Sequence, residues 1–258
     1  MRPVHRVRWP AFGAVMDRDI TPGPHQEMGE RMAEQVAFLF DMDGTIADTM
    51  PFHIQAWMSL LGELGVQMGP EEFLRKTSGK MNHQILREVL GIPISDADLA
   101  AFDERKESLF RTLCGPHLKP IGGLMEFLAD SRRQGILMAV ATAAGKANRA
   151  FTLDGLGITA YFDAVVGAED VQSGKPSPEI FLRAAERVGA APSSCVVFED
   201  ALSGVEAAER AGMKAVAMAT SLTAREFQGH PAVIRIAADY TSLRPQDLLR
   251  MARPPKSG

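Results

Sequence analysis

Polar residues able to do chemistry follow the short apolar runs of this sequence, directly or in the next loop. In an open α/β sheet the carboxyl ends of the strands meet at one crevice, so residues that follow such runs converge there. Most of these residues are carboxylates, which repel one another unless a cation lies between them. A small number of carboxylate oxygens suits Mg²⁺, which keeps waters and shares a substrate phosphate as its other ligands. The residues are Asp41, Asp43, Thr142, Lys175, Glu199 and Asp200.

The spacing of Asp41 and Asp43 suits two carboxylates that act on one substrate. On an extended chain, residues i and i+2 point to the same side, and Gly44 lets the chain turn sharply after them. An Asx-turn or a helix cap at the strand end is the structural alternative. A calcium loop does not fit, because Gly44 stands at its fourth position instead of the sixth and Phe52 replaces the bidentate glutamate.

Short apolar runs that do not alternate with polar residues predict strands buried on both faces of a parallel sheet. They cover residues 36–40, 136–141, 164–166, 195–198 and 215–218. Helical patterns between them cover 123–133, 147–156, 178–188 and 201–211. The alternation predicts an α/β fold with a doubly wound parallel sheet.

The stretch between the first two runs contains amphipathic helical patterns and no strand-like run of that quality. We therefore predict a helical cap domain at 50–118, inserted into an α/β core domain made of 35–49 and 119–258. Residues 1–34 carry four prolines, mixed charges and no periodicity, which predicts a flexible tail. Met28 and Met32 lie just before the first strand, so the alternative is that residues 1–31 do not belong to the natural protein.

The composition excludes several classes of function. A net charge of −4, from 28 basic and 32 acidic residues, gives no reason to expect a nucleic-acid partner. No apolar stretch approaches the roughly 18 residues of a membrane helix. The two distant cysteines indicate neither a disulfide framework nor a zinc site. We expect a monomeric cytoplasmic protein without a nucleic-acid or membrane partner.

Four segments resemble the signatures of the haloacid dehalogenase-like (HAD) superfamily. They are 38–45 with Asp41 and Asp43, 140–144 with Thr142, 174–176 with Lys175, and 198–200 with Glu199 and Asp200. The helical insert resembles the cap of the β-phosphoglucomutase-like subgroup, through residues 49–57 and the pair Arg105-Lys106. The resemblance covers residues 36 to about 220 and implies a Rossmann-like core. Ala143, Ala144 and Ala201 stand where many members carry Ser or Gly, which blurs the substrate class.

The resemblance implies a role for each residue of the core motifs. Asp41 would attack phosphorus and form an aspartyl-phosphate, and Asp43 would be the general acid and base. Mg²⁺ would be held by Asp41, the backbone carbonyl of Asp43 and Asp200, with Glu199 beside them. The phosphate would be bound by Thr142, Ala143 and Lys175.

Cap residues are the candidates for substrate contacts: Thr49, His53, Lys80, Asn82 and Lys106. For His53 the alternative is a surface or core histidine, and Lys106 is favoured as a solvated charge on a helix. We expect hydrolysis of a small phosphorylated metabolite such as a sugar phosphate. The alternative is a phosphomutase of the β-phosphoglucomutase type. A dehalogenase is disfavoured, because Asp43 and Gly44-Thr45 suit phosphate chemistry.

Overall fold

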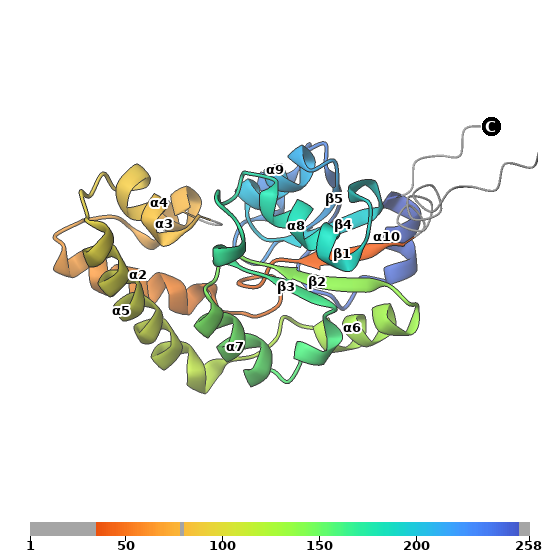
Figure 1. Cartoon of the computed structure of the whole chain (residues 1–258), viewed down its shortest axis with the longest axis horizontal. Coiled ribbons are helices and arrows are strands. Elements are labelled where there is room, and N and C mark those ends of the chain that lie inside the picture. The colour runs from red at the N-terminus through yellow and green to blue at the C-terminus, as the bar shows by residue number, and fades with distance from the viewer. Residues whose placement is uncertain (1–34, 78–79, 253–258) are drawn as a thin grey trace, which may run out of the picture.

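The computed structural model describes residues 35–77 and 80–252, and their strands form a six-stranded parallel sheet (Figure 1). The strand order is β3-β2-β1-β4-β5-β6. This order runs in opposite directions from β1 and from β4, so the switch point of the sheet lies between these two strands. The strands are β1 Ala37–Phe40, β2 Leu137–Ala141, β3 Ala164–Val166, β4 Cys195–Glu199, β5 Lys214–Met218 and β6 Val233–Ala237.

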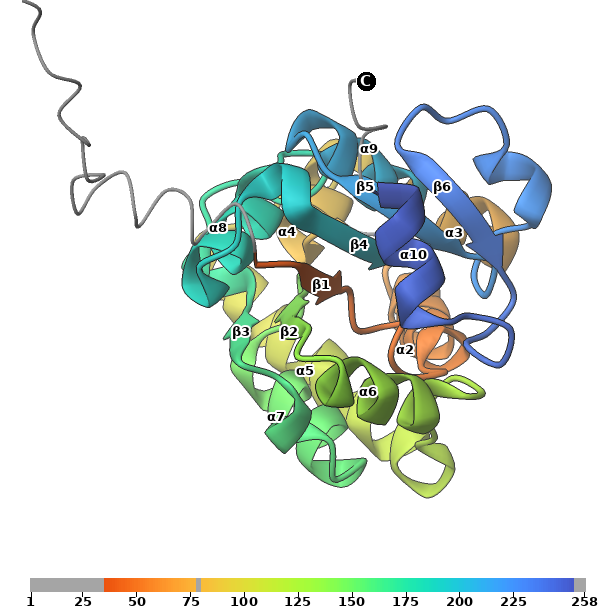
Figure 2. The ribbon, with the colours of Figure 1, turned by 90° about the vertical axis from the view of Figure 1, so that its right-hand side faces the viewer.

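Helices cover both faces of the sheet, because its central strands are apolar on both sides. In β1, Ala37 and Leu39 pack on one face, whereas Phe38 and Phe40 pack on the other. Figures 1 and 2 show the helices arranged in these two layers. The first face carries α8 (Glu179–Val188) and α9 (Leu202–Arg210), and the second carries α6 (Leu124–Arg133), α7 (Lys146–Gly155) and α10 (Pro245–Ala252).

An aromatic cluster on the second face holds the ends of β1 and β4 together. The rings of Phe40 and Phe198 are stacked with their centroids 4.5 Å apart, and Tyr240 packs against both. The Tyr240 hydroxyl donates to the carbonyl of Thr45 at 3.2 Å. Buried aromatic side chains contribute much of the energy of such a core, so the two strand ends that carry the polar motifs have a rigid support.

The helices between β1 and α6 form a separate layer beyond the carboxyl ends of the strands, which we call the cap (Figure 1). Its inner part packs around Trp57 and Phe73. A second apolar group around Phe110 includes Phe151 of α7 and so joins the cap to the core. The elements are α2 Met50–Glu63, α3 Pro70–Thr77, α4 Asn82–Gln84, a π-helical turn Ile85–Val89 and α5 Asp96–Cys114.

The cap leaves and rejoins the core through two adjacent segments. The N–H of Asp48 donates to the carbonyl of Lys119 at 3.2 Å, and their side chains form an ion pair at 3.0 Å. Ala47 also pairs with Pro120 in an isolated bridge. The two connections are therefore held side by side.

The predicted doubly wound α/β fold with inserted helices is confirmed. The strand β6 and the helix α10 were not predicted from the sequence. In β6, Arg235 is exposed between half-buried neighbours, so this edge strand lacks the continuous apolar run of the central strands. The predicted tail at 1–34 lies outside the described residues. Within the described part, no helix is long and apolar enough to cross a membrane.

Candidate active site

The switch point of the sheet brings three carboxylates together. Asp41 follows β1, and its N–H donates to the carbonyl of Phe198 in β4 at 3.0 Å. Glu199 ends β4 and Asp200 follows it. In open α/β sheets ligands bind in the crevice at this position, so the strand order places the predicted motif residues where a ligand can reach them.

Lys175 enters this group from the loop after β3 and is 1% exposed. Its ammonium donates to Asp41 Oδ1 and to Glu199 Oε1, both at 2.5 Å. Burial alone would lower the pKa of Lys175, but the Asp41 and Glu199 carboxylates more than reverse this and raise it. Lys175 is therefore a cation that fixes the orientation of the Asp41 side chain.

Negative charge exceeds positive charge at this point of the site. Burial raises the pKa of Asp41 to about 7, against the attraction of Lys175. Burial and the repulsion of Glu199 and Asp41 raise the pKa of Asp200 well above its usual range. The Ser221 hydroxyl donates to Asp200 but brings no charge. A bound cation would offset this excess of negative charge.

The oxygen donors of the site fit Mg²⁺. Asp41 and Asp200 are buried carboxylates, and the backbone carbonyl of Asp43 is the further oxygen donor predicted from the sequence. Among the described residues, no three His, Cys, Asp or Glu side chains form a metal cluster by themselves. The usual Mg²⁺ site combines one or two carboxylates with waters and substrate phosphate, and Asp41 and Asp200 could supply the carboxylates.

Two neighbouring groups define the shape of this site. Gly44 has φ +80°, and a β-carbon on it would overlap the Asp200 carboxylate, so only glycine leaves room for Asp200 there. Glu199 uses Oε1 for Lys175 and accepts from the N–H of Ala201 with Oε2 at 2.9 Å. Both oxygens of Glu199 are thus engaged in orienting Lys175 and the loop after β4.

The loop after β2 offers hydrogen-bond donors to an anion. The N–H of Ala144 donates to Thr142 Oγ1 at 3.1 Å, so the Thr142 hydroxyl hydrogen must point away from it. No acceptor for this hydrogen is found among the described residues. Arg149 of α7 donates to the carbonyl of Ala144 at 2.8 Å and so fixes the position of the loop. Thr142 and Ala143 line the same cavity as Asp41.

Asp43 is held by two side chains from the start of the cap. Thr49 Oγ1 donates to Asp43 Oδ1 at 2.7 Å, and His53 Nε2 lies 3.2 Å from the same oxygen. Burial alone would raise the pKa of Asp43, but His53 and the Thr49 hydrogen bond more than offset this, so the pKa is lowered. Thr49 is fully buried and serves Asp43, which differs from its predicted role as a substrate contact.

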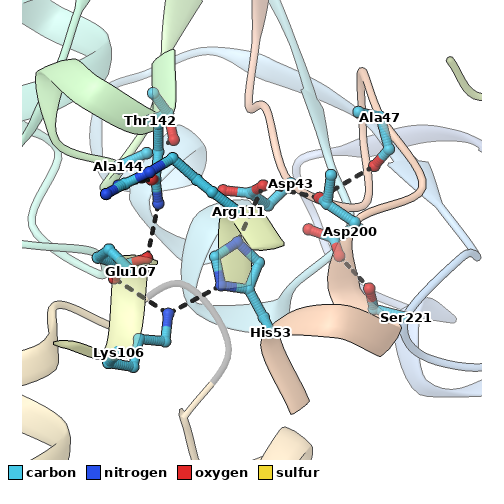
Figure 3. A network of polar contacts seen from close by, with 12 residues as sticks. Asp43, Ala47, His53, Lys106, Glu107, Arg111, Thr142, Ala144, Asp200 and Ser221 are labelled. Atoms are coloured by element: carbon cyan, nitrogen blue, oxygen red, sulfur yellow. Dashed lines mark hydrogen bonds and ion pairs between the residues drawn. The ribbon is translucent and has the colours of Figure 1, made fainter. Parts of the chain in front are cut away.

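The prediction that Lys106 is a solvated surface charge is wrong, because its side chain is 3% exposed. Its ammonium lies 2.8 Å from His53 Nδ1 and donates to Glu107 Oε1 at 3.0 Å. Figure 3 shows Lys106 of α5 between Glu107 of the same helix and His53 of α2, and His53 in turn faces Asp43. The amphipathic pattern of α5 places Lys106 on the exposed face, but contacts from α2 bury its side chain.

A cavity of about 110 Å³ lies between the core motifs and the cap. Its floor contains Asp41, Asp43 and Thr142, and one wall is apolar, with Met50, Trp57 and Phe73 among its residues. Of the predicted cap contacts, the cavity is lined by His53, Lys80, Asn82 and Lys106. The arrangement can hold a small molecule with its anionic end on the floor and its body under the cap.

Three residues of this region were not predicted from the sequence. Ser221 lies after β5, so its place beyond a strand end could have revealed it. Glu107 of α5 and Asn148 of α7 both line the cavity and are hydrogen-bonded to each other. Their sequence positions carry no comparable signal, because their contact depends on how the cap is docked.

Comparison with known proteins gives a consistent result. A family model described as "Haloacid dehalogenase-like hydrolase" matches residues 38–218. The fructose-1-phosphate phosphatase YqaB of Escherichia coli is 38% identical over 191 residues, which are 73% of this chain and 97% of that protein. A phosphorylated carbohydrates phosphatase of Thermotoga maritima is 34% identical over 183 residues, covering 70% of this chain and 83% of that protein.

The fold also matches a solved structure. A HAD hydrolase of family IA, variant 3, from Entamoeba histolytica superimposes with a TM-score of 0.76 at 25% identity. The match covers 85% of this chain and 100% of that chain. It therefore includes both the sheet and the inserted helices.

Proposed function

The chain belongs to the haloacid dehalogenase-like hydrolase family, and we propose that it hydrolyses phosphate monoesters of small sugars or polyols through a phosphorylated Asp41. The observation that carries this proposal is the placement of Asp41. Its carboxylate is held by Lys175 on the floor of a cavity that also contains Asp43 and Thr142. A nucleophile, an acid/base and a phosphate-binding group thus face one cavity.

Asp41 is the nucleophile of the first step. One carboxylate oxygen attacks phosphorus, and the bond between phosphorus and the ester oxygen breaks. Lys175 keeps that side chain in one orientation and offers positive charge to the phosphoryl oxygens. Thr142 donates its hydroxyl hydrogen to one of these oxygens. Mg²⁺, bound by Asp41, Asp200 and the Asp43 carbonyl, would screen the charge between the carboxylate and the phosphate.

Asp43 handles the protons of both steps. In its acid form it gives a proton to the departing ester oxygen, and it then takes a proton from the water that attacks the phosphorylated Asp41. Its hydrogen bond from Thr49 and its contact with His53 keep it aimed at the cavity. The second step releases inorganic phosphate and restores the Asp41 carboxylate.

The cavity and the relatives together support the substrate class. A volume of about 110 Å³ suits a short-chain or single-ring leaving group. Polar side chains such as Asn82 and Glu107 offer partners for hydroxyl groups, and Met50 and Trp57 offer an apolar wall for C–H surfaces. Two relatives that this chain matches over most of their length are named as phosphatases of fructose 1-phosphate and of phosphorylated carbohydrates.

A panel assay tests this proposal. The panel contains p-nitrophenyl phosphate, glycerol 1-phosphate, fructose 1-phosphate, glucose 6-phosphate and β-glucose 1-phosphate, each with Mg²⁺ and with the Asp41→Asn protein as a blank. We expect phosphate release from one or more of the sugar or polyol esters. A phosphomutase would use the same Asp41 and Asp43. Conversion of β-glucose 1-phosphate to glucose 6-phosphate with catalytic bisphosphate, and negligible free phosphate, would establish that alternative instead.

A further inference from the structure

Asn148 is a core residue whose carboxamide is hydrogen-bonded to two side chains of the cap. It lies in the first turn of α7 and is 3% exposed. Its Oδ1 accepts from Arg111 Nη1 at 2.8 Å, and its Nδ2 donates to Glu107 Oε2 at 2.6 Å. Glu107 and Arg111 are four residues apart in α5, so they lie one turn apart on the same face of that helix.

The chemistry of the two partners fixes the orientation of this carboxamide. A guanidinium group can only donate and a carboxylate can only accept, so the oxygen of Asn148 must face Arg111 and its nitrogen must face Glu107. A side chain that both donates and accepts is needed between them. Asn148 is therefore a specific polar contact between core and cap, which the apolar contact of Phe151 with Phe110 could not supply alone.

The same Glu107 begins a continuous series of polar contacts that leads back to the core. Its Oε1 accepts from Lys106, whose ammonium also lies 2.8 Å from His53 Nδ1. Because Lys106 has no acceptor, it donates to Nδ1, which leaves the hydrogen of His53 on Nε2. That nitrogen lies 3.2 Å from Asp43 Oδ1 (Figure 3). The path thus starts on α7 of the core, crosses the cap and ends at the acid/base.

We propose that Asn148 is a positioning residue, which holds α5 against the core so that Lys106 and His53 align Asp43 for proton transfer. This proposal rests on the proposed function. It assigns to a residue outside the four motifs an effect on one part of the reaction, the protonation of the departing oxygen. Binding of the phosphoryl group by Thr142 and Lys175 would not depend on it.

Leaving groups that differ in basicity separate the two parts. An alkyl ester needs a proton on its departing oxygen, whereas p-nitrophenolate leaves without one, so loss of general-acid catalysis affects the alkyl ester far more. Asn148→Ala removes both contacts to α5 and leaves a good helix-forming residue in α7. Arg111→Met breaks one of the same contacts from the cap side. Asp154→Ala is the matched control, because it removes an exposed hydrogen bond to Thr159 from the same helix α7.

The experiment compares kcat/KM for p-nitrophenyl phosphate and for the fastest alkyl phosphate of the panel. We expect Asn148→Ala to lower kcat/KM for the alkyl ester about tenfold or more, and that for p-nitrophenyl phosphate less than about threefold. Arg111→Met should shift the ratio in the same direction, and it decides the matter if the Asn148 variant does not fold. Asp154→Ala should leave both values unchanged.

Two results would overturn the proposal. One is an Asn148→Ala enzyme that keeps its alkyl-ester activity within about twofold of the parent. The other is an equal loss on both substrates, which would mean that Asn148 supports phosphate binding or the fold in general. Failure of the proposed function is distinguishable, because the parent enzyme would then release no phosphate from either ester.

Discussion

The carboxylate of Glu199 lies so close to the backbone of Gly204 that a β-carbon on Gly204 would overlap it. Gly204 is in α9, which begins just after the loop that carries Asp200. Glu199 in turn holds Lys175, and Lys175 holds Asp41. The absence of one side chain in a helix therefore allows the whole charged floor of the site to form.

Gly204→Ala reverses the usual effect of replacing glycine in a helix. Alanine is normally more favourable there by about 1 kcal/mol, but here it must displace the buried Glu199 carboxylate, so we expect a lower melting temperature and weaker activity. Gly62→Ala in α2 is the control, because its β-carbon would meet nothing within 4 Å. Thermal unfolding of both variants checks this. Stabilisation by Gly204→Ala equal to that by Gly62→Ala would contradict it.

Asp41→Asn should abolish turnover without weakening the fold. A carboxamide is a poor nucleophile, so we expect activity below about a thousandth of the parent value. Burial raises the pKa of Asp41, which means that its charge is unfavourable in the folded state, so the melting temperature should be equal or higher. Activity assays and thermal melts test the two parts. A folded variant with more residual activity would show that another group attacks phosphorus.

Lys175→Met should impair stability as well as catalysis. It leaves Asp41 and Glu199 buried without their cation, and breaking a buried pair in this way costs about 3–5 kcal/mol. Lys76→Met is the control, since Lys76 forms an exposed pair with Glu72 worth about 0–1 kcal/mol. Urea unfolding gives both free energies. Similar small losses in the two variants would mean that Lys175 is not essential to the stability of the site.

Glu107 should make the folded protein less stable as the pH falls into the acidic range. Burial alone would raise its pKa, but Lys106, His53 and Asn82 more than offset this, so its pKa lies below the ordinary value of 4.5. A carboxylate with a lowered pKa contributes stability that is present above the unfolded-state value and lost as pH falls through the folded-state value.

Glu107→Gln lacks this titration, so its melting temperature should fall less steeply than that of the parent between about pH 5 and 3. Glu104→Gln is the control, because the Glu104 side chain is 76% exposed and its loss should leave the slope close to that of the parent. Melting curves across this range provide the measurement. Parallel curves for the parent and Glu107→Gln would contradict the role of Glu107 as a charged partner.

The core of the site was predictable because its residues follow strands that are apolar on both faces. Asp41, Thr142 and Asp200 all lie at such strand ends, and the sheet topology brings them together. Residues of the cap were less predictable. Lys106 stands in an amphipathic helix where spacing alone predicts an exposed charge, and its burial depends on His53 from another helix.

The contacts of Asn148 could not be predicted from the sequence pattern. Its partners are 37 and 41 residues away in the chain, and they meet it only when two layers of the molecule are packed together. The edge strand β6 was missed for a related reason, since partial exposure removes the apolar run that marks a central strand. Periodicity reports what one element buries, whereas contacts between layers depend on the final packing.

The adjacent segments at Asp48 and Lys119 limit how far a change in the inserted helices can disturb the sheet. Because the two ends of the insertion are held together, the length of the inserted segment has little effect on the stability of the sheet. Each doubling of a flexible loop adds only about 0.6 kcal/mol of closure entropy. The inserted helices can therefore change in length at little cost to the sheet, whereas a change at Thr49, His53 or Lys106 would also alter the contacts of Asp43.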